Sequence, residues 1–133
     1  MSKLIFMIIL TPFEHALISL EEVLQLPKTS VVRDSAIQRF EYTYELGIKM
    51  LKRILEQVES AKASVDELGF KDLIRLGAEK GFIKNPESWF AYRESRNITS
   101  HAYDQDKAES IYLILPAFAT DARLLFSQLQ EVQ

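Results

Sequence analysis

The sequence predicts an all-α fold, an up-and-down antiparallel bundle of about five helices, in one domain over residues 1–133. Apolar residues recur at steps of three and four along most of the chain, as on one face of a helix, whereas a strand needs steps of two. Only four glycines and four prolines occur, too few for a β fold with a turn every ~8–12 residues. The abundance of Leu, Glu, Lys, Gln and Ala also favours helix.

Residues 1–10 form an apolar N-terminal extension, in which the run Leu4 to Leu10 follows a basic start. This run is far shorter than the ~20 residues of a membrane span, and no small-residue cleavage site of a signal peptide follows it. We therefore expect the extension to pack on the bundle or on a partner. The expected localisation is cytoplasmic, without contact to a membrane.

The first helix is expected to begin at Thr11-Pro12-Phe13-Glu14. Thr11 is a possible cap, Pro12 fits the first helical position, and Glu14 stands where a capping box has its acid. Pro27 is expected to end this helix, because proline cannot continue a helical hydrogen-bond ladder.

The second helix is expected from Thr29 or Ser30 to about Ser60. Its apolar positions from Ile37 to Val58 follow steps of 3, 4, 4, 3, 4 and 3, which only a helix places on one face. Gly47 lies inside it and costs about 1 kcal/mol relative to alanine. A close contact with another helix would explain this glycine.

Two shorter helices should follow, one over 69–80 and one from Pro86 to about Ala102. Gly81 stands where a helix C-terminus favours glycine, and Asn85-Pro86 is typical of a cap followed by a first helical residue. The last helix should open at Asp104 or Asp106 and run close to the C-terminus. Pro116 lies within it and predicts a kink.

Polar residues gather where the fourth helix is expected to end. Asn97 and His101 are four residues apart, so they share a face, and Arg96 and Tyr103 nearly eclipse if the helix persists that far. Arginine binds phosphate through a planar pair of hydrogen bonds, and histidine transfers protons near neutral pH. This set suits phosphate chemistry. The alternative is structural, because cations near a helix C-terminus also favour its dipole.

The composition limits what such a site can bind. The net charge of −3 argues against gripping nucleic acid by overall charge, so any RNA contact must be confined to a local cleft. The chain has no cysteine, which excludes thiolate zinc sites. The only carboxylates that follow the polar stretch closely are Asp104 and Asp106. Neither a metal nor a cofactor is therefore predicted.

The stretch from Arg96 to Tyr103 resembles the Arg-x4-His-x-Tyr signature of HEPN proteins of the HepT type, also described as nucleotidyltransferase substrate-binding proteins. The segment Ile37 to Leu46 resembles the other well-marked segment of that family, on the second helix. Trp89 ahead of the arginine, and the order of the helices, fit as well. The resemblance extends from Thr11 to Leu129, nearly the whole chain.

The resemblance implies a helical bundle that forms a homodimer and pairs with a cognate minimal nucleotidyltransferase, as toxin and antitoxin. The family member is then a metal-independent ribonuclease, which its partner silences by transferring AMP to the signature tyrosine. Carried over to this sequence, Arg96 and His101 would be catalytic, Asn97 would assist them, and Tyr103 would be the modified residue.

Three charged residues of the second helix are candidates for supporting this site. Glu41 and Glu45 share a face, whereas Arg39 and Glu41 do not. Ion pairs across the bundle from these residues would orient Arg96. The alternative is a solvated helix face with no such role.

Three functions stay open at this point. The first is a partner or substrate-binding subunit of a minimal nucleotidyltransferase in a two-component system, with a ribonuclease-like Arg-x4-His-x-Tyr site. The second is an active metal-independent endoribonuclease toxin, silenced by AMP transfer to Tyr103. The third is a non-catalytic helical interaction protein. Whether the chain is an enzyme is therefore left open.

Overall fold

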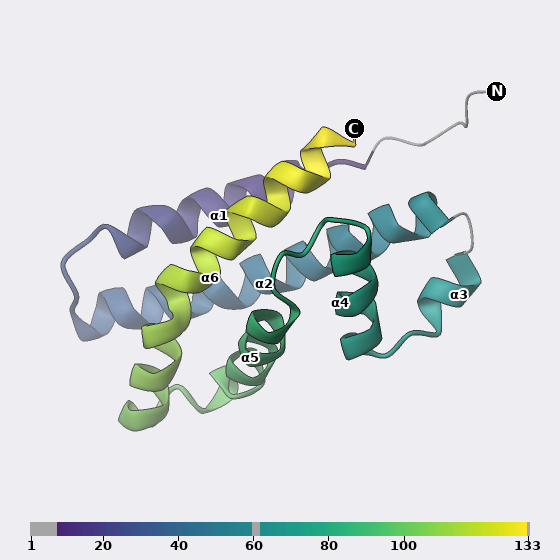
Figure 1. Cartoon of the computed structure of the whole chain (residues 1–133). Helices are drawn as coiled ribbons and strands as arrows, with labels where there is room; N and C mark the ends of the chain where they lie inside the picture. Colours follow the sequence, from purple (N-terminus) through teal and green to yellow (C-terminus); the bar gives the residue numbers. More distant parts are fainter. Residues whose placement is uncertain (1–7, 60–61, 133) are drawn as a thin grey trace.

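The computed structural model describes residues 8–59 and 62–132 of the chain (Figure 1). The predicted all-α bundle is confirmed in these ranges. Their six α-helices and one 3-10 turn are α1 (Thr11–Leu24), α2 (Ser30–Glu59), α3 (Lys62–Asp66), α4 (Phe70–Glu79), α5 (Pro86–Asn97), η1 (Thr99–His101) and α6 (Gln105–Glu131).

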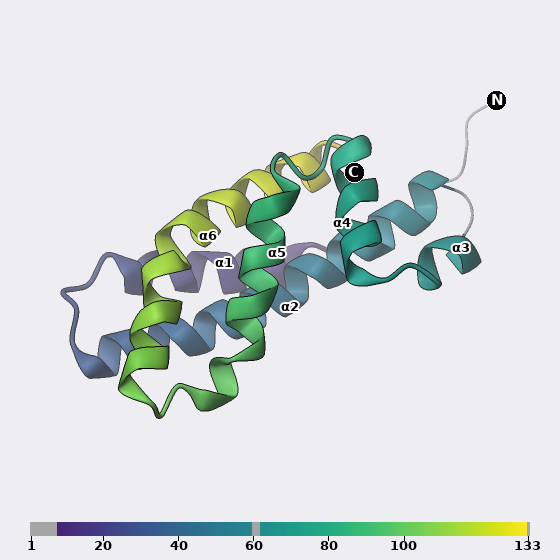
Figure 2. The ribbon, with the colours of Figure 1, turned by 60° about the horizontal axis from the view of Figure 1, so that its bottom comes forward.

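The long helices α1, α2 and α6 form the frame of the molecule. Figure 1 shows α1 and α2 side by side in opposite directions, and α6 packs against both. The helix α5 descends beside this frame and α6 returns from its lower end (Figure 2). The short helices lie at the other end, α4 against α5 and α2, and α3 against α2. The end of α5 therefore lies next to the start of α6.

A cluster of aromatic rings forms the part of the core that joins α5 to the frame. Phe118 of α6 lies at its centre and is fully buried. Its ring centroid is 4.8 Å from that of Phe40 on α2, 5.2 Å from that of Tyr92 and 5.7 Å from that of Trp89 on α5. The Tyr92 hydroxyl also donates a hydrogen bond to Asp121 of α6. These contacts fix the position of α5 and of its C-terminal end.

The first helix starts as expected, but without the expected cap. Thr11 lies within α1, and the N-cap residue is Leu10, which makes no side-chain cap bond. The Leu10 carbonyl accepts the first helical bond from the Glu14 N–H, at 2.9 Å. The prediction of a Thr11 cap is therefore wrong. The side chains of Ile8 and Leu10 are buried, so this part of the extension packs on the bundle, and the rest of it lies outside the described residues.

The second helix agrees with its predicted limits. Thr29 caps α2, since its Oγ1 accepts from the Val32 N–H at 3.0 Å. A Cβ at Gly47 would lie 3.2 Å from two ring carbons of Phe13 on α1 and 3.6 Å from Leu125 on α6. The expected close contact at Gly47 is confirmed.

The helix α3 was not predicted, which is why the structure has more helices than expected. It is five residues long, too short to show a helical repeat in the sequence. Its neighbour α4 matches the prediction within one residue at each end, and Asn85 is the N-cap of α5 by position, although its side chain makes no cap bond.

The last helix begins and bends as predicted. Asp104 is its N-cap, and its carboxylate accepts from the Lys107 N–H at 3.1 Å. Figure 1 shows that α6, which contains Pro116, changes direction along its length. Judged by length and composition alone, α6 could cross a membrane. However, Leu115, Phe118 and Leu125 are buried among the other helices, which is the pattern of a core helix.

Gly81 ends α4 with φ +89°, a backbone conformation that costs an L-residue with a Cβ about 1–2 kcal/mol. The N–H of Phe82 donates to the Gly77 carbonyl at 2.8 Å, and that of Gly81 donates to Ala78 at 3.1 Å, which is a Schellman cap. Gly81→Ala is therefore expected to lower the free energy of unfolding by about 1–2 kcal/mol in urea titrations. Gly81→Asn should lose less of this free energy, because asparagine tolerates a positive φ better than alanine does. Equal losses would contradict this interpretation.

Candidate functional site

The helix α5 ends at Asn97, earlier than the expected Ala102. Ile98 is the C-cap, and a 3-10 turn, η1, follows. The Thr99 hydroxyl donates to the Arg96 carbonyl at 2.8 Å, which is the local bonding by which threonine competes with a helix ladder. The expectation that Asn97 and His101 share one helix face is therefore wrong. The helix does not persist to Tyr103, which was the condition for Tyr103 to eclipse Arg96.

Arg96 lies in the last turn of α5 and pairs with Glu45 of α2. Its Nε donates to Glu45 Oε1 at 2.5 Å, and the two side chains are 35% and 53% exposed. The predicted ion pair across the bundle is thus confirmed for Glu45. It uses Nε, and the described residues show no bond to the two terminal nitrogens of Arg96. Those nitrogens are free to bind a phosphate bidentately.

For the other two support candidates, the described part of the chain shows no side-chain hydrogen bond or ion pair with Arg96. Glu41 accepts a hydrogen bond from the Thr99 hydroxyl at 3.0 Å, so it holds the turn that follows α5. Arg39 donates from Nη1 to the Ser19 carbonyl of α1 at 2.7 Å. Arg39 therefore connects α1 and α2, away from the site for which it was predicted.

His101, the last residue of η1, and Tyr103, two residues later, lie side by side. The distance from His101 Nδ1 to the Tyr103 hydroxyl oxygen is 3.5 Å, and the ring centroids are 6.0 Å apart. Both side chains are exposed, that of Tyr103 by 83%. A tyrosine hydroxyl is thus presented to solvent next to a group that can accept its proton.

Asn97 lies apart from this pair. It lines a groove between α4 and α5 together with Phe70, Phe90 and Arg93. In the part of the chain that the structure describes, no three His, Asp or Glu side chains are grouped so that they could hold a metal ion.

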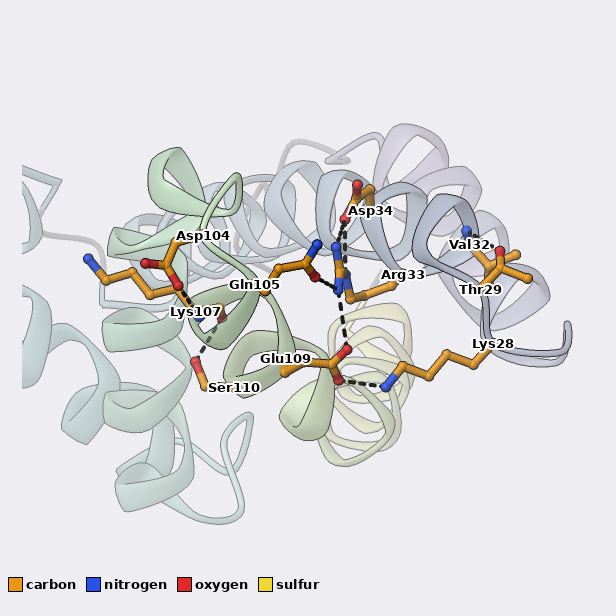
Figure 3. Close-up of polar contacts among 10 residues, drawn as sticks. All are labelled: Lys28, Thr29, Val32, Arg33, Asp34, Asp104, Gln105, Lys107, Glu109 and Ser110. Atoms are coloured by element: carbon orange, nitrogen blue, oxygen red, sulfur yellow. Dashed lines mark hydrogen bonds and ion pairs between the residues drawn. The ribbon is translucent and has the colours of Figure 1, made fainter.

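A buried arginine that the sequence analysis missed ties the start of α6 to the start of α2 (Figure 3). The side chain of Arg33 is 7% exposed. It donates to Asp34 at 3.0 Å, to Gln105 at 2.6 Å and to Glu109 at 3.2 Å. Because α6 begins directly after the site residues, this network fixes where the site's loop ends. Its burial had a signal in the sequence. Arg33 lies four residues before Ile37, so the two side chains share the core face of α2.

The carboxylate of Glu109 forms ion pairs with two cations in this network, Lys28 and Arg33. Lys28 first, and then Arg33, hold the pKa of its carboxyl below the usual range through hydrogen bonds. A lowered folded-state pKa contributes stability above the unfolded pKa, and this contribution is lost as the pH falls through the folded value. We expect Glu109→Gln to destabilise the protein at about pH 7 and to have a much smaller effect at about pH 3.

Urea titrations of both proteins at the two pH values measure this difference. The matched control is Glu22→Gln on α1, which changes the same group at an exposed position and should show no pH-dependent difference. A Glu109→Gln effect of the same size at both pH values would contradict the ionic role.

Comparisons with known proteins agree with this fold. Residues 9–131 match the family described as "Nucleotidyltransferase substrate binding protein like". The chain belongs to this family. The resemblance that the sequence analysis named is thereby confirmed, over nearly the same range of residues.

Individual members show the same likeness. The Haemophilus influenzae protein named "Probable ribonuclease HepT" is 42% identical over 106 residues, which are 77% of this chain and 73% of that protein. A solved structure from Haemophilus influenzae, described as the fold of a substrate binding domain of a nucleotidyltransferase, matches with TM-score 0.86 and 35% identity. That match covers 91% of this chain and 98% of the other. A crystal structure from Thermus thermophilus matches with TM-score 0.78 and 32% identity, over 88% and 98% of the two chains.

Proposed function

We propose that this chain is the partner subunit of a minimal nucleotidyltransferase in a cytoplasmic two-component system, and that Tyr103 accepts AMP from that enzyme. Membership of the nucleotidyltransferase substrate-binding family supports the partner. Two observations support Tyr103: the residue is 83% exposed, and its hydroxyl oxygen lies 3.5 Å from His101 Nδ1.

This geometry is compatible with the following transfer. The Tyr103 oxygen attacks the α-phosphorus of ATP, a new oxygen–phosphorus bond forms, and the bond to pyrophosphate breaks. The phenol proton passes to a base, and the neighbouring His101 imidazole is within reach as the nucleophile forms. The product carries an adenylyl group directly beside His101.

The test is AMP transfer by the cognate nucleotidyltransferase, read by intact mass. We expect the chain to gain one adenylyl group with ATP, and Tyr103→Phe to gain none, because phenylalanine has no hydroxyl. Tyr42→Phe is the matched control, since Tyr42 is another exposed tyrosine, on α2, and this variant should be modified like the wild type. Equal modification of Tyr103→Phe would overturn the assignment of Tyr103.

A second candidate function, metal-independent RNA cleavage, is supported by Arg96 and His101 and by the name of the ribonuclease-like relative. In this mechanism His101 takes the proton of a ribose 2′-hydroxyl, whose oxygen attacks the adjacent phosphorus while the 5′-oxygen leaves. Arg96 stabilises the charge that develops on the phosphate. DNA has no 2′-hydroxyl and is expected to resist cleavage.

The two functions are compatible in one protein. An adenylyl group on Tyr103 would place a negative phosphodiester against His101 and fill the space that an RNA phosphate needs. In a homodimer, two copies of Arg96 and His101 would gather positive charge in one cleft, although the whole chain carries a net charge of −3. If a folded sample shows neither AMP transfer nor RNA cleavage, the function that remains is that of a non-catalytic interaction protein.

A further inference from the structure

A groove between α4 and α5 combines aromatic, cationic and amide side chains next to the candidate site. Phe70 and Lys71 come from α4, and Phe90, Arg93 and Asn97 come from α5. Phe70 and Phe90 are half-buried, and the other three are exposed. The functions proposed above use none of these residues.

Arg93 is presented in the geometry that stacks on a base. Its guanidinium carbon lies over the Phe70 ring, 4.4 Å from the centroid, and the Arg93 side chain is exposed. Phe90 supports the same wall, with its centroid 6.4 Å from that of Phe70 and the rings nearly edge to face. Proteins that bind single-stranded RNA stack its bases on aromatic rings and on arginine planes of this kind.

The charge of the groove favours a base over a run of phosphates. The cations Lys71 and Arg93 are matched by three carboxylates of the same lining, Asp72, Glu87 and Glu94. A surface that follows the nucleic acid backbone is strongly positive, and this one is not. Amides and carboxylates are, however, the groups that bind the polar edges of bases.

The groove lies next to the candidate site, because Arg93 of its lining and Arg96 are three residues apart on α5 and therefore share a face of that helix. We propose that this groove is a base-binding subsite for single-stranded RNA, which stacks a nucleotide next to the scissile one on the Arg93 guanidinium. The proposal rests on the ribonuclease candidate for the neighbouring site. It gives Asn97 a role in holding the substrate base rather than in the chemistry.

The test measures RNA affinity separately from cleavage. Short single-stranded RNA is titrated against the full chain carrying His101→Ala, which keeps the RNA intact. In that background, Arg93→Gln and Phe90→Ala should each weaken binding about tenfold, the size of one lost stacking contact. The matched control is Arg123→Gln, which removes the same charge from a groove between α1 and α6 and should leave the affinity unchanged.

Cleavage kinetics of the variants with intact His101 give the second readout. Arg93→Gln should raise KM far more than it lowers kcat, because it removes binding and leaves the reacting groups in place. Arg93→Lys keeps the charge but not the stacking plane, so it should not restore the affinity.

Three results would overturn the subsite, and they separate it from the ribonuclease proposal. Cleavage by the wild type with unchanged affinity in both groove variants would reject the subsite alone. Loss of nucleotidyltransferase binding in Arg93→Gln, with RNA affinity intact, would make the groove a protein-docking surface. If the wild type neither binds nor cleaves RNA, both proposals are rejected together.

Discussion

Replacing His101 with alanine is expected to lower RNA cleavage by about 10²- to 10⁴-fold, the contribution of a positioned general acid or base. The imidazole is exposed at the end of η1, directly beside Tyr103. It is the group of the site that can both accept the 2′-hydroxyl proton and donate one to the leaving oxygen. Arg96→Ala should also remove most of the rate, because phosphate charge would develop without a guanidinium beside it.

The measurement is cleavage of a mixed RNA pool in EDTA by purified wild-type and variant proteins. His15→Ala is the matched control, because His15 is the other histidine of the chain and lies exposed on α1. This variant should cleave normally. Equal cleavage by His101→Ala and the wild type would remove His101 from the mechanism. Cleavage that disappears in EDTA would contradict a metal-independent reaction.

An inactive wild-type sample has two distinct explanations. An intact mass that includes an adenylyl group would indicate a chain already silenced at Tyr103. A folded, unmodified and inactive chain would reject the ribonuclease candidate and leave the partner-subunit proposal standing. Growth arrest on expression, relieved by His101→Ala, would support the ribonuclease in cells.

Phe118→Ala is expected to lower the free energy of unfolding by about 3–5 kcal/mol. Phe118 is fully buried, and its ring contacts rings from both α2 and α5. Alanine would leave a cavity at the point where α5 joins the frame. Since domains are stable by only about 5–15 kcal/mol, this loss removes a large share of the total.

Urea unfolding followed by the fluorescence of Trp89, the single tryptophan of the chain, measures this loss. Leu113→Ala is the matched control, because Leu113 lies on the same helix and is 77% exposed. Its effect should stay within about 0.5 kcal/mol. Similar losses in the two variants would contradict a core centred on Phe118.

The sequence by itself determined the five longer α-helices and predicted where the candidate site lies. Apolar steps of three and four, and local signals such as Thr29 and Asp104 at helix starts or Gly81 at a helix end, depend on neighbours within a turn or two. They can therefore be read without the fold. The polar stretch from Arg96 to Tyr103 was likewise visible as residue types in order.

Only the tertiary structure decided how those residues are arranged. The end of α5 at Asn97 involves Thr99, whose hydroxyl bonds both the Arg96 carbonyl and Glu41 of a distant helix. Of the carboxylates on one face of α2, Glu45 pairs with Arg96, a choice that depends on where α5 crosses α2.

The burial of Arg33 was decided in the same way. Its register placed it on the core face, but an arginine can be buried only where partners compensate its charge. One of those partners, Asp34, is the next residue in the chain. The others, the carboxylate of Glu109 and the amide of Gln105, lie more than 70 residues away. Local propensity set the helices because each helix is a short-range structure. Contacts between distant segments set the site, because they exist only once the bundle has formed.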